Sequence, residues 1–231
     1  VTGVITNATP GNTYPVIYYF TNPCLSYTIV NVTSIEAPSG TLSGSASLCP
    51  DECANFSFDF TSGSEPYTIN LTANPGGIPL PPIPGVGVST NFTICYTGSG
   101  PLPTIDMSTF TINIPTTFSG SGSLTLTGIS DGSGCPGTAT GGFDLTLLPN
   151  PVASPAGPLT ACADQNGDGT FDLTTLDNIV NGGNGSLIVY WYEDAAGTIP
   201  ISNPAAYISA GGTVYATVTS GNCESNTIAI T

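Results

Sequence analysis

The segment from Asp164 to Asp172 carries oxygen-bearing side chains at the spacing of a calcium-binding loop. These side chains alternate along the segment and belong to Asp164, Asn166, Asp168, Thr170 and Asp172. Calcium takes about six to eight oxygen ligands, and Gly169 stands at the sixth loop position, where such loops turn sharply. The chain has no basic side chain that could balance these carboxylates, so the pattern predicts a possible calcium site.

An alternative interpretation of the same loop needs no metal. The twelfth position is Thr175 rather than the bidentate Glu of an EF-hand, and no flanking helices are expected. An Asx-rich turn, in which the carboxylates cap backbone amides, would then lead into a strand. Both interpretations stay open at the level of the sequence.

Seven cysteines form the second chemical group: Cys24, Cys49, Cys53, Cys95, Cys135, Cys162 and Cys223. Without any His, zinc sites of mixed ligand type are excluded, so disulfides in an oxidising, extracellular setting are expected. Cys162 and Cys223 bracket the last part of the chain, and we predict a bond between them. The preferred pairs elsewhere are Cys49–Cys135 and Cys53–Cys95. Cys24 then remains as a buried free thiol or forms an intersubunit bond.

The charge inventory excludes several functions. The chain has 15 acidic residues and no Lys, Arg or His. Nothing can neutralise phosphates or anionic lipid headgroups, so nucleic acid and membrane partners are not expected, and no apolar run reaches membrane-spanning length. Ser and Cys also lack their usual catalytic base, and no carboxylate pair stands out for glycoside hydrolysis. We therefore expect the protein not to be an enzyme.

Short runs that alternate apolar residues with Thr, Ser or Asn dominate the chain and are typical of half-buried strands. They cover 16–20, 25–30, 56–60, 67–71, 92–96, 110–114, 124–127, 143–147, 187–192, 214–218 and 227–230. Gly and Pro punctuate them, whereas only residues 173–180 could form a short helix. This spacing predicts an all-β chain of sandwiches.

Two small-residue or Pro-rich stretches divide the chain, at 37–45 and 148–158. They predict β-sandwiches at 43–150 and 151–231. Residues 1–42 hold too few strands for a sandwich and are either the tail of a preceding domain or strands added to the next one.

Five motifs characterise the last unit: Cys162-Ala-Asp-Gln-Asn-Gly-Asp-Gly-Thr-Phe-Asp-Leu173, Tyr190-Trp-Tyr-Glu-Asp194, Asn203-Pro-Ala-Ala-Tyr207, Val214-Tyr-Ala-Thr-Val218 and Gly221-Asn-Cys223. Through these motifs the last unit resembles an immunoglobulin-like module of very large secreted proteins of Bacteroidota. The middle unit is similar to a second module of these proteins through Phe56-Ser-Phe-Asp-Phe60, Glu65-Pro-Tyr67 and Ser130-Asp-Gly-Ser-Gly-Cys135. Where the family carries a basic residue, this chain has Thr217.

The resemblance implies tandem immunoglobulin-like sandwiches joined by Pro-rich linkers in cell-surface adhesins or filaments exported by type IX secretion. The expected function is thus a non-enzymatic structural or adhesive segment outside the cell. Its partners would be copies of itself, through strand addition for example, or neighbouring domains of one long protein. The alternative is a calcium-dependent module that binds glycans or surfaces through the aromatic side chains of Tyr190, Trp191, Tyr192 and Tyr207, although a single Trp is more typical of a core.

Overall fold

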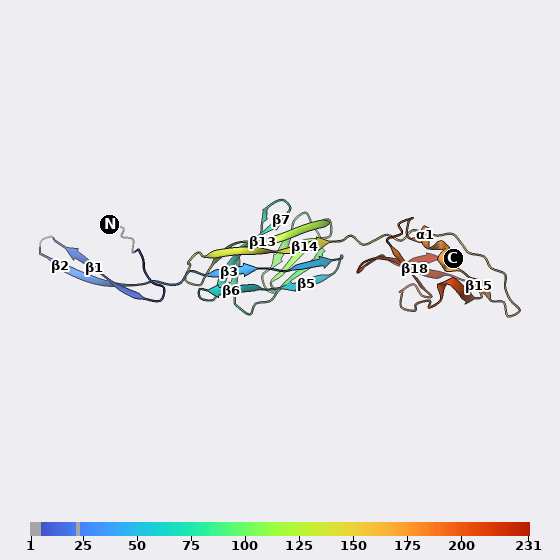
Figure 1. Ribbon diagram of the computed structural model, residues 1–231, viewed down its shortest axis with the longest axis horizontal. Coiled ribbons are helices and arrows are strands. Elements are labelled where there is room, and N and C mark those ends of the chain that lie inside the picture. The colour runs from blue at the N-terminus through green and yellow to red at the C-terminus, as the bar shows by residue number, and fades with distance from the viewer. Residues whose placement is uncertain (1–5, 22–23) are drawn as a thin grey trace. The chain divides into compact units, whose positions relative to one another are not determined.

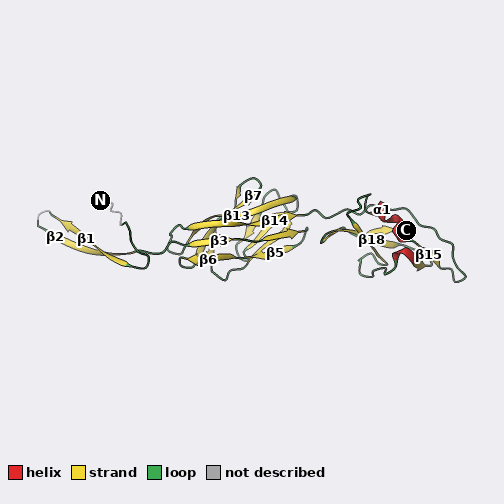
Figure 2. Cartoon of the chain, in the orientation of Figure 1, coloured by secondary structure: helices red, strands yellow, loops and turns green. Residues whose placement is uncertain are grey.

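The computed structural model describes residues 6–21 and 24–231 (Figure 1). About half of the chain is in strands, and the described helical segments are short: η1 (Leu173–Leu176), α1 (Asp177–Val180) and η2 (Pro204–Ala206). Figure 2 shows how completely strands dominate the fold. The prediction of an all-β sandwich protein is confirmed, and the helix expected at 173–180 is present as η1 followed by α1.

Contacts divide the chain into two compact units. Unit 1 takes in the described residues up to Ala46, together with Cys53–Pro115 and Ser121–Thr146. Unit 2 consists of Ser47–Glu52, Thr116–Gly120 and Leu147–Thr231. Two short segments from earlier in the chain therefore belong to unit 2, and all residues from Leu147 onward belong to it. The three-part division into 1–42, 43–150 and 151–231 stays a prediction.

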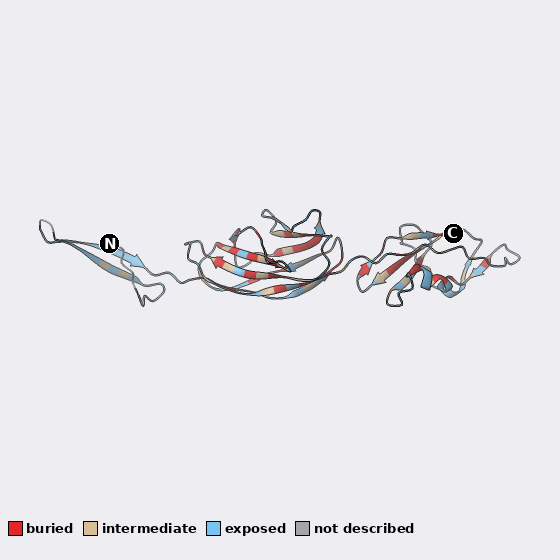
Figure 3. Ribbon diagram, turned by 90° about the horizontal axis from the view of Figure 1, so that it is seen from above, coloured by how far each residue is buried: buried red, intermediate tan, exposed pale blue. Residues whose placement is uncertain are grey.

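Unit 1 begins with an antiparallel hairpin of β1 (Thr13–Phe20) and β2 (Ser26–Thr33). The two strands form a two-stranded sheet of their own and pair with no other described strand. Most of the hairpin is exposed, including the large side chains of Tyr19 and Tyr27, whose rings face each other across the strands. The pale blue colouring of this ribbon in Figure 3 shows the same exposure.

The body of unit 1 is built from two sheets. One sheet has the order β6-β3-β14-β13-β7-β8, with β4 paired to β14 and β9 to β7, and the other has the order β11-β12-β10-β5. In chain order the strands are β3 (Ser39–Leu42), β4 (Ser45–Leu48), β5 (Cys53–Phe56), β6 (Phe58–Ser62), β7 (Tyr67–Asn74), β8 (Ile78–Pro79), β9 (Ile83–Val86), β10 (Phe92–Gly98), β11 (Thr104–Asp106), β12 (Thr111–Pro115), β13 (Gly120–Ser130) and β14 (Thr138–Leu147).

Alternation along the strands creates the core of unit 1. In β7, every second side chain from Tyr67 to Ala73 is buried, and the intervening Thr and Asn side chains face outward. Phe56 packs against Phe92 and Phe143, with ring centroids 5.4 and 5.2 Å apart, within the range of favourable aromatic pairs. Burying an apolar side chain of this size stabilises a fold by about 1.5–3 kcal/mol.

Unit 2 has smaller sheets. One pairs β15 (Gly169–Phe171) with β17 (Tyr207–Ser209), and the other pairs β18 (Val214–Ser220) with β16 (Ile188–Tyr192), β19 (Cys223–Glu224) and β20 (Ile228–Ile230). The core gathers Ala153, Leu173, Leu176, Val180, Trp191, Ala216, Val218 and Ile230. The short helical segments thus contribute their apolar side chains to the same core as the strands.

No helix within the described residues is both long enough and apolar enough to cross a lipid bilayer.

Candidate functional site

A disulfide between Cys49 and Cys223 connects residues that are 174 positions apart in the sequence. Both cysteines belong to unit 2, their Cα atoms lie 5.4 Å apart, and both are almost completely buried. The predicted pairs Cys162–Cys223 and Cys49–Cys135 are therefore wrong. The turn after β18 meets the Ser47–Glu52 segment instead, whereas Cys162 is exposed in the segment before β15.

A tight turn positions Cys49 for this bond. The backbone amide of Glu52 donates to the carbonyl of Cys49 at 3.1 Å, and a Glu52 carboxylate oxygen accepts from the amide of Cys49 at 2.8 Å. Pro50 occupies the second position and Asp51, with a φ of 70°, the third. Pro followed by a left-handed residue is the pattern of a type II turn. The sequence Cys-Pro-Asp-Glu therefore presents Cys49 in a fixed orientation.

The second disulfide, Cys53–Cys95, lies within the four-stranded sheet of unit 1. Cys53 on β5 stands directly opposite Cys95 on β10, with Cα atoms 4.0 Å apart. This pairing was predicted and is confirmed. Only three residues separate Cys49 from Cys53, so the chain passes from one disulfide to the other within a single turn.

Cys24, Cys135 and Cys162 are free cysteines. Cys24 is unpaired within the chain, as predicted, but it is exposed, so the interpretation as a buried thiol is wrong. The intersubunit bond stays a prediction. Cys135 lies in the turn between β13 and β14, which the buried carboxylate of Asp131 organises. One oxygen of Asp131 accepts from the amides of Ser133 and Cys135, at 3.0 and 3.2 Å.

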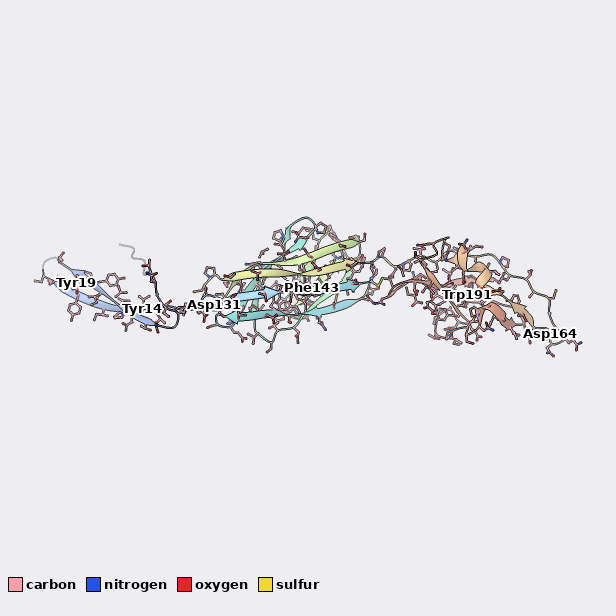
Figure 4. The ribbon with its side chains drawn as sticks, in the orientation of Figure 1. Tyr14, Tyr19, Asp131, Phe143, Asp164 and Trp191 are labelled. Atoms are coloured by element: carbon pink, nitrogen blue, oxygen red, sulfur yellow. A yellow bond between two sulfur atoms is a disulfide. The ribbon has the colours of Figure 1, made fainter. Side chains whose placement is uncertain are left out.

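The loop predicted to bind calcium forms a compact Asx turn. The Asp164 carboxylate accepts from the amides of Asn166 and Asp168, at 2.8 and 3.0 Å (Figure 4 labels Asp164). These hydrogen bonds, the one from Asp168 foremost, hold the pKa of Asp164 below its ordinary value. Thr170 is exposed on β15, and Asp172 caps η1 by accepting from the amide of Thr174.

The loop thus adopts the turn that was the alternative interpretation. In the described part of the chain, no group of three or more His, Cys, Asp or Glu side chains is placed so that it could hold a metal ion. The calcium site itself stays a prediction.

The aromatic side chains of unit 2 divide between core and surface. Trp191 is buried, and its indole nitrogen donates to the Asp177 carboxylate at 2.9 Å. Tyr190, the next residue on β16, is about half exposed. Tyr207 lines a pocket of about 250 Å³ together with Leu159 and Phe171. Trp191 therefore belongs to the core, and a planar platform of all four aromatic residues does not form.

Thr217, the departure from the resembled family, is buried in β18 and donates to the Glu224 carboxylate at 2.6 Å. A hydroxyl therefore satisfies, without a cation, the acidic side chain that lies beside Cys223.

The Cys49–Cys223 bond gives meaning to a comparison with a known protein family. Residues 158–231 are similar to the Flavobacterium inter-domain disulphide bond domain, whose family model they match. The match covers about a third of the chain and includes Cys223 but not Cys49. The disulfide therefore leaves the matched segment and reaches a residue far earlier in the chain. A search of curated proteins found no match.

Sequence reasoning missed the partner of Cys223 and the two side chains that shape the cysteine turns, Glu52 and Asp131. The Cys-Pro-Asp-Glu turn was a usable signal, because it indicates a cysteine presented at a corner rather than within a strand. Nothing in the spacing identifies which distant cysteine faces that corner.

Proposed function

We propose that this chain is a non-enzymatic structural segment of an extracellular, multidomain bacterial surface protein of the adhesin or filament kind, built to withstand tension. The observation that carries this proposal is the Cys49–Cys223 disulfide. Disulfides persist in oxidising, extracellular environments, and the match to a Flavobacterium inter-domain disulphide bond domain supports a multidomain setting.

The covalent connectivity explains how the chain would withstand tension. A pulling force applied at the two ends passes from Cys49 directly to Cys223 through the S–S bond. The residues between the two cysteines, which include most of both units, are bypassed and experience no stretching along the chain. In the chain-entropy model, closing a loop of this length also stabilises the fold by about 5 kcal/mol.

The composition supports a passive role. Every one of the 15 charged side chains is acidic, and the chain has no His or Lys to serve as a general base. It also has no Lys or Arg, so proteases that require these residues find no cleavage site. Such a composition suits a polypeptide that must endure outside the cell.

Export by type IX secretion and incorporation into a repeat array follow from the resemblance to Bacteroidota surface proteins. Copies of the chain or neighbouring domains of the same protein would be its partners. The hairpin β1–β2 favours such partners, because Ile17, Tyr19 and Tyr27 are exposed on one of its faces and Tyr18 and Phe20 on the other. A two-stranded ribbon is marginally stable alone, so its apolar faces are suited to being covered by another β-sheet.

Immunoelectron microscopy of the cells that make the protein tests this proposal. Gold-labelled antibody raised against the chain should decorate extended material on the outside of intact cells. Decoration should be lost when the gene is deleted, which serves as the control. Label confined to the cell interior, visible only after permeabilisation, would contradict a surface role.

A further inference from the structure

The β1–β2 hairpin presents large apolar side chains on both of its faces. Residues directly opposite each other in the two strands share a face, from the Thr13–Thr33 pair to the Phe20–Ser26 pair. The first face carries Ile17, Tyr19, Tyr27 and Ile29, and the second face carries Tyr18, Phe20, Val30 and Val32. Each of these side chains is 38–66% exposed, so much of both faces is open to solvent.

This pattern differs from that of the strands in the body of unit 1. β7 buries every second side chain and turns Thr and Asn outward between them. In β1, by contrast, the residues from Val16 to Phe20 are an unbroken apolar run, which is typical of strands that are covered on both faces. A two-stranded ribbon is also only marginally stable alone. The hairpin therefore has the sequence of an element that is covered on both faces.

The hairpin carries no charge. The first acidic residue of the chain is Glu36, so none of the 15 carboxylates belongs to β1 or β2. A charged partner would find no opposite charge on either face, and burying its own charges there would be costly. The surface that suits these faces is itself uncharged and apolar. The same hairpin in a second copy of the chain meets that requirement, and contact through it brings no carboxylates together at the interface.

The exposed area indicates how much of the hairpin must be covered. Tyr19 and Tyr27 on the first face are 65% and 66% exposed, and Tyr18 and Phe20 on the second face are 48% and 54% exposed. An aromatic side chain can bury about 150–250 Å², so these aromatic rings offer roughly 350–580 Å² over the two faces. The aliphatic side chains add to this area. A stable complex buries about 800 Å² on each partner, so one face alone falls short, whereas both faces together approach it.

We propose that the β1–β2 hairpins of successive copies of this chain pack face to face, the first face on the first face and the second on the second. Each contact is then isologous, made by the same residues of both copies. Because the two faces lie on opposite sides of the ribbon, each hairpin lies between the hairpins of two other copies, and the assembly continues from copy to copy. This inference rests on the proposed function and deepens it, because it names the surface through which copies associate.

Sedimentation velocity of the purified full chain tests the inference, after its free cysteines are alkylated so that no new disulfide can join copies. Species larger than a dimer should form as the protein concentration rises. The association should strengthen when the salt concentration is raised from about 0.1 to 1 M, because the Debye length falls from about 10 to 3 Å and the acidic copies repel each other less. Weaker association at high salt would indicate a contact between charged groups and overturn the inference.

Variants of one face at a time test the geometry. Tyr19→Thr/Tyr27→Thr removes the aromatic rings of the first face, and Tyr18→Thr/Phe20→Thr removes those of the second, while Thr keeps a high strand propensity. Each variant retains one intact face, so each should associate no further than a dimer, and the variant with all of these substitutions should be monomeric. Circular dichroism and denaturant unfolding should show an unchanged body of unit 1, since β1 and β2 pair with no other described strand.

Tyr190→Thr/Ile208→Thr, which removes two exposed apolar side chains of unit 2, is the matched control and should associate like the unaltered chain. The inference is overturned if the unaltered chain stays monomeric at every concentration and salt, or if the hairpin variants associate as it does. Monomers from either single-face variant would likewise rule out contacts between like faces. A monomeric chain that antibody still labels on the cell surface would refute this inference and leave the proposed function standing.

Discussion

At the scale of the residue, several carboxylates in this protein accept hydrogen bonds from neutral donors, because the chain has no Lys, Arg or His side chain to pair with them. Asp131, Asp164 and Asp194 each accept two or more backbone amides, and Glu224 accepts from a threonine hydroxyl. A hydrogen bond to a charged group that is shielded from water, as at the buried Asp131, contributes about 1.5–3 kcal/mol. The acidic residues are thus turn-forming elements as much as surface charges.

Asp131 offers the clearest test of that role. Asp131→Ala should destabilise unit 1 by roughly 1–3 kcal/mol, because the backbone amides of Ser133 and Cys135 lose their buried acceptor. Asp131→Asn keeps an acceptor oxygen and should cost less. Asp144→Ala, which changes an exposed carboxylate, is the control. Denaturant unfolding measures all three, and equal stabilities of the Asp131→Ala and Asp144→Ala variants would refute the assignment.

A second prediction at this scale concerns proton binding. Hydrogen bonds from Ile199 and Thr198 lower the pKa of Asp194, as those from Asp168 and Asn166 lower the pKa of Asp164. Both carboxylates should therefore titrate below the ordinary value of 3.8 in carbon-detected NMR. The stabilisation that they provide is complete above 3.8 and is lost as the pH falls through their folded-state pKa.

Thr198→Val isolates the cause, because it removes one donor to Asp194 and none to Asp164. The Asp194 midpoint should rise while the Asp164 midpoint stays in place; movement of both, or of neither, would contradict the proposed cause.

The calcium prediction is tested in the same spectra. Millimolar calcium at neutral pH should shift the side-chain signals of Asp164 and Asp168, and unchanged signals would refute a calcium site.

At the scale of the element, alternation in the sequence predicts most strands, because each has one face in a core. The run from Phe56 to Phe60 is instructive, since a single strand was predicted there. The structure breaks it at Ser57, with β5 in the four-stranded sheet and β6 in the other. Phe56 and Phe58 are both buried, as they would be in one regular strand, although the chain changes sheets between them. Periodicity within a single run contains no signal for a change of partner sheet.

The close approach of β14 to β3 depends on Gly141. Its φ is 87°, and a Cβ atom added there would lie 2.1 Å from the carbonyl oxygen of Leu42. Gly141→Ala should therefore destabilise unit 1 by roughly 2–5 kcal/mol, through left-handed strain together with the clash. Gly134→Ala is a matched control, because Gly134 also has a positive φ but open space around its Cβ position.

Thermal and denaturant unfolding measure both variants. The control should lose only about 1–2 kcal/mol, the cost of the backbone conformation alone. Equal losses in Gly141→Ala and Gly134→Ala would show that the strand contact imposes no steric requirement.

At the scale of the whole molecule, sequence reasoning anticipated an all-β, disulfide-bonded architecture but not the bond between Cys49 and Cys223. The sequence was sufficient for this prediction, because strands and turns leave local patterns in it and the cysteine count indicates disulfides. Cys53 and Cys95 were paired correctly. The partner of Cys223 depends on which turn faces it in three dimensions, and Cys162 brackets the last unit without facing that turn. Pairing by position in the sequence therefore failed where distant segments combine.

The central claim is that the Cys49–Cys223 bond lets the chain withstand tension. Single-molecule force spectroscopy tests this claim most directly. The chain is held by its two ends and pulled with and without a reductant. With Cys49–Cys223 intact, the 174-residue span between the cysteines should not extend. Reduction should release up to about 600 Å of additional contour length, at about 3.3–3.6 Å per residue. A Cys53→Ala/Cys95→Ala variant, which keeps the longer bridge, should still require reductant for that release. Full extension of the oxidised chain would contradict the account.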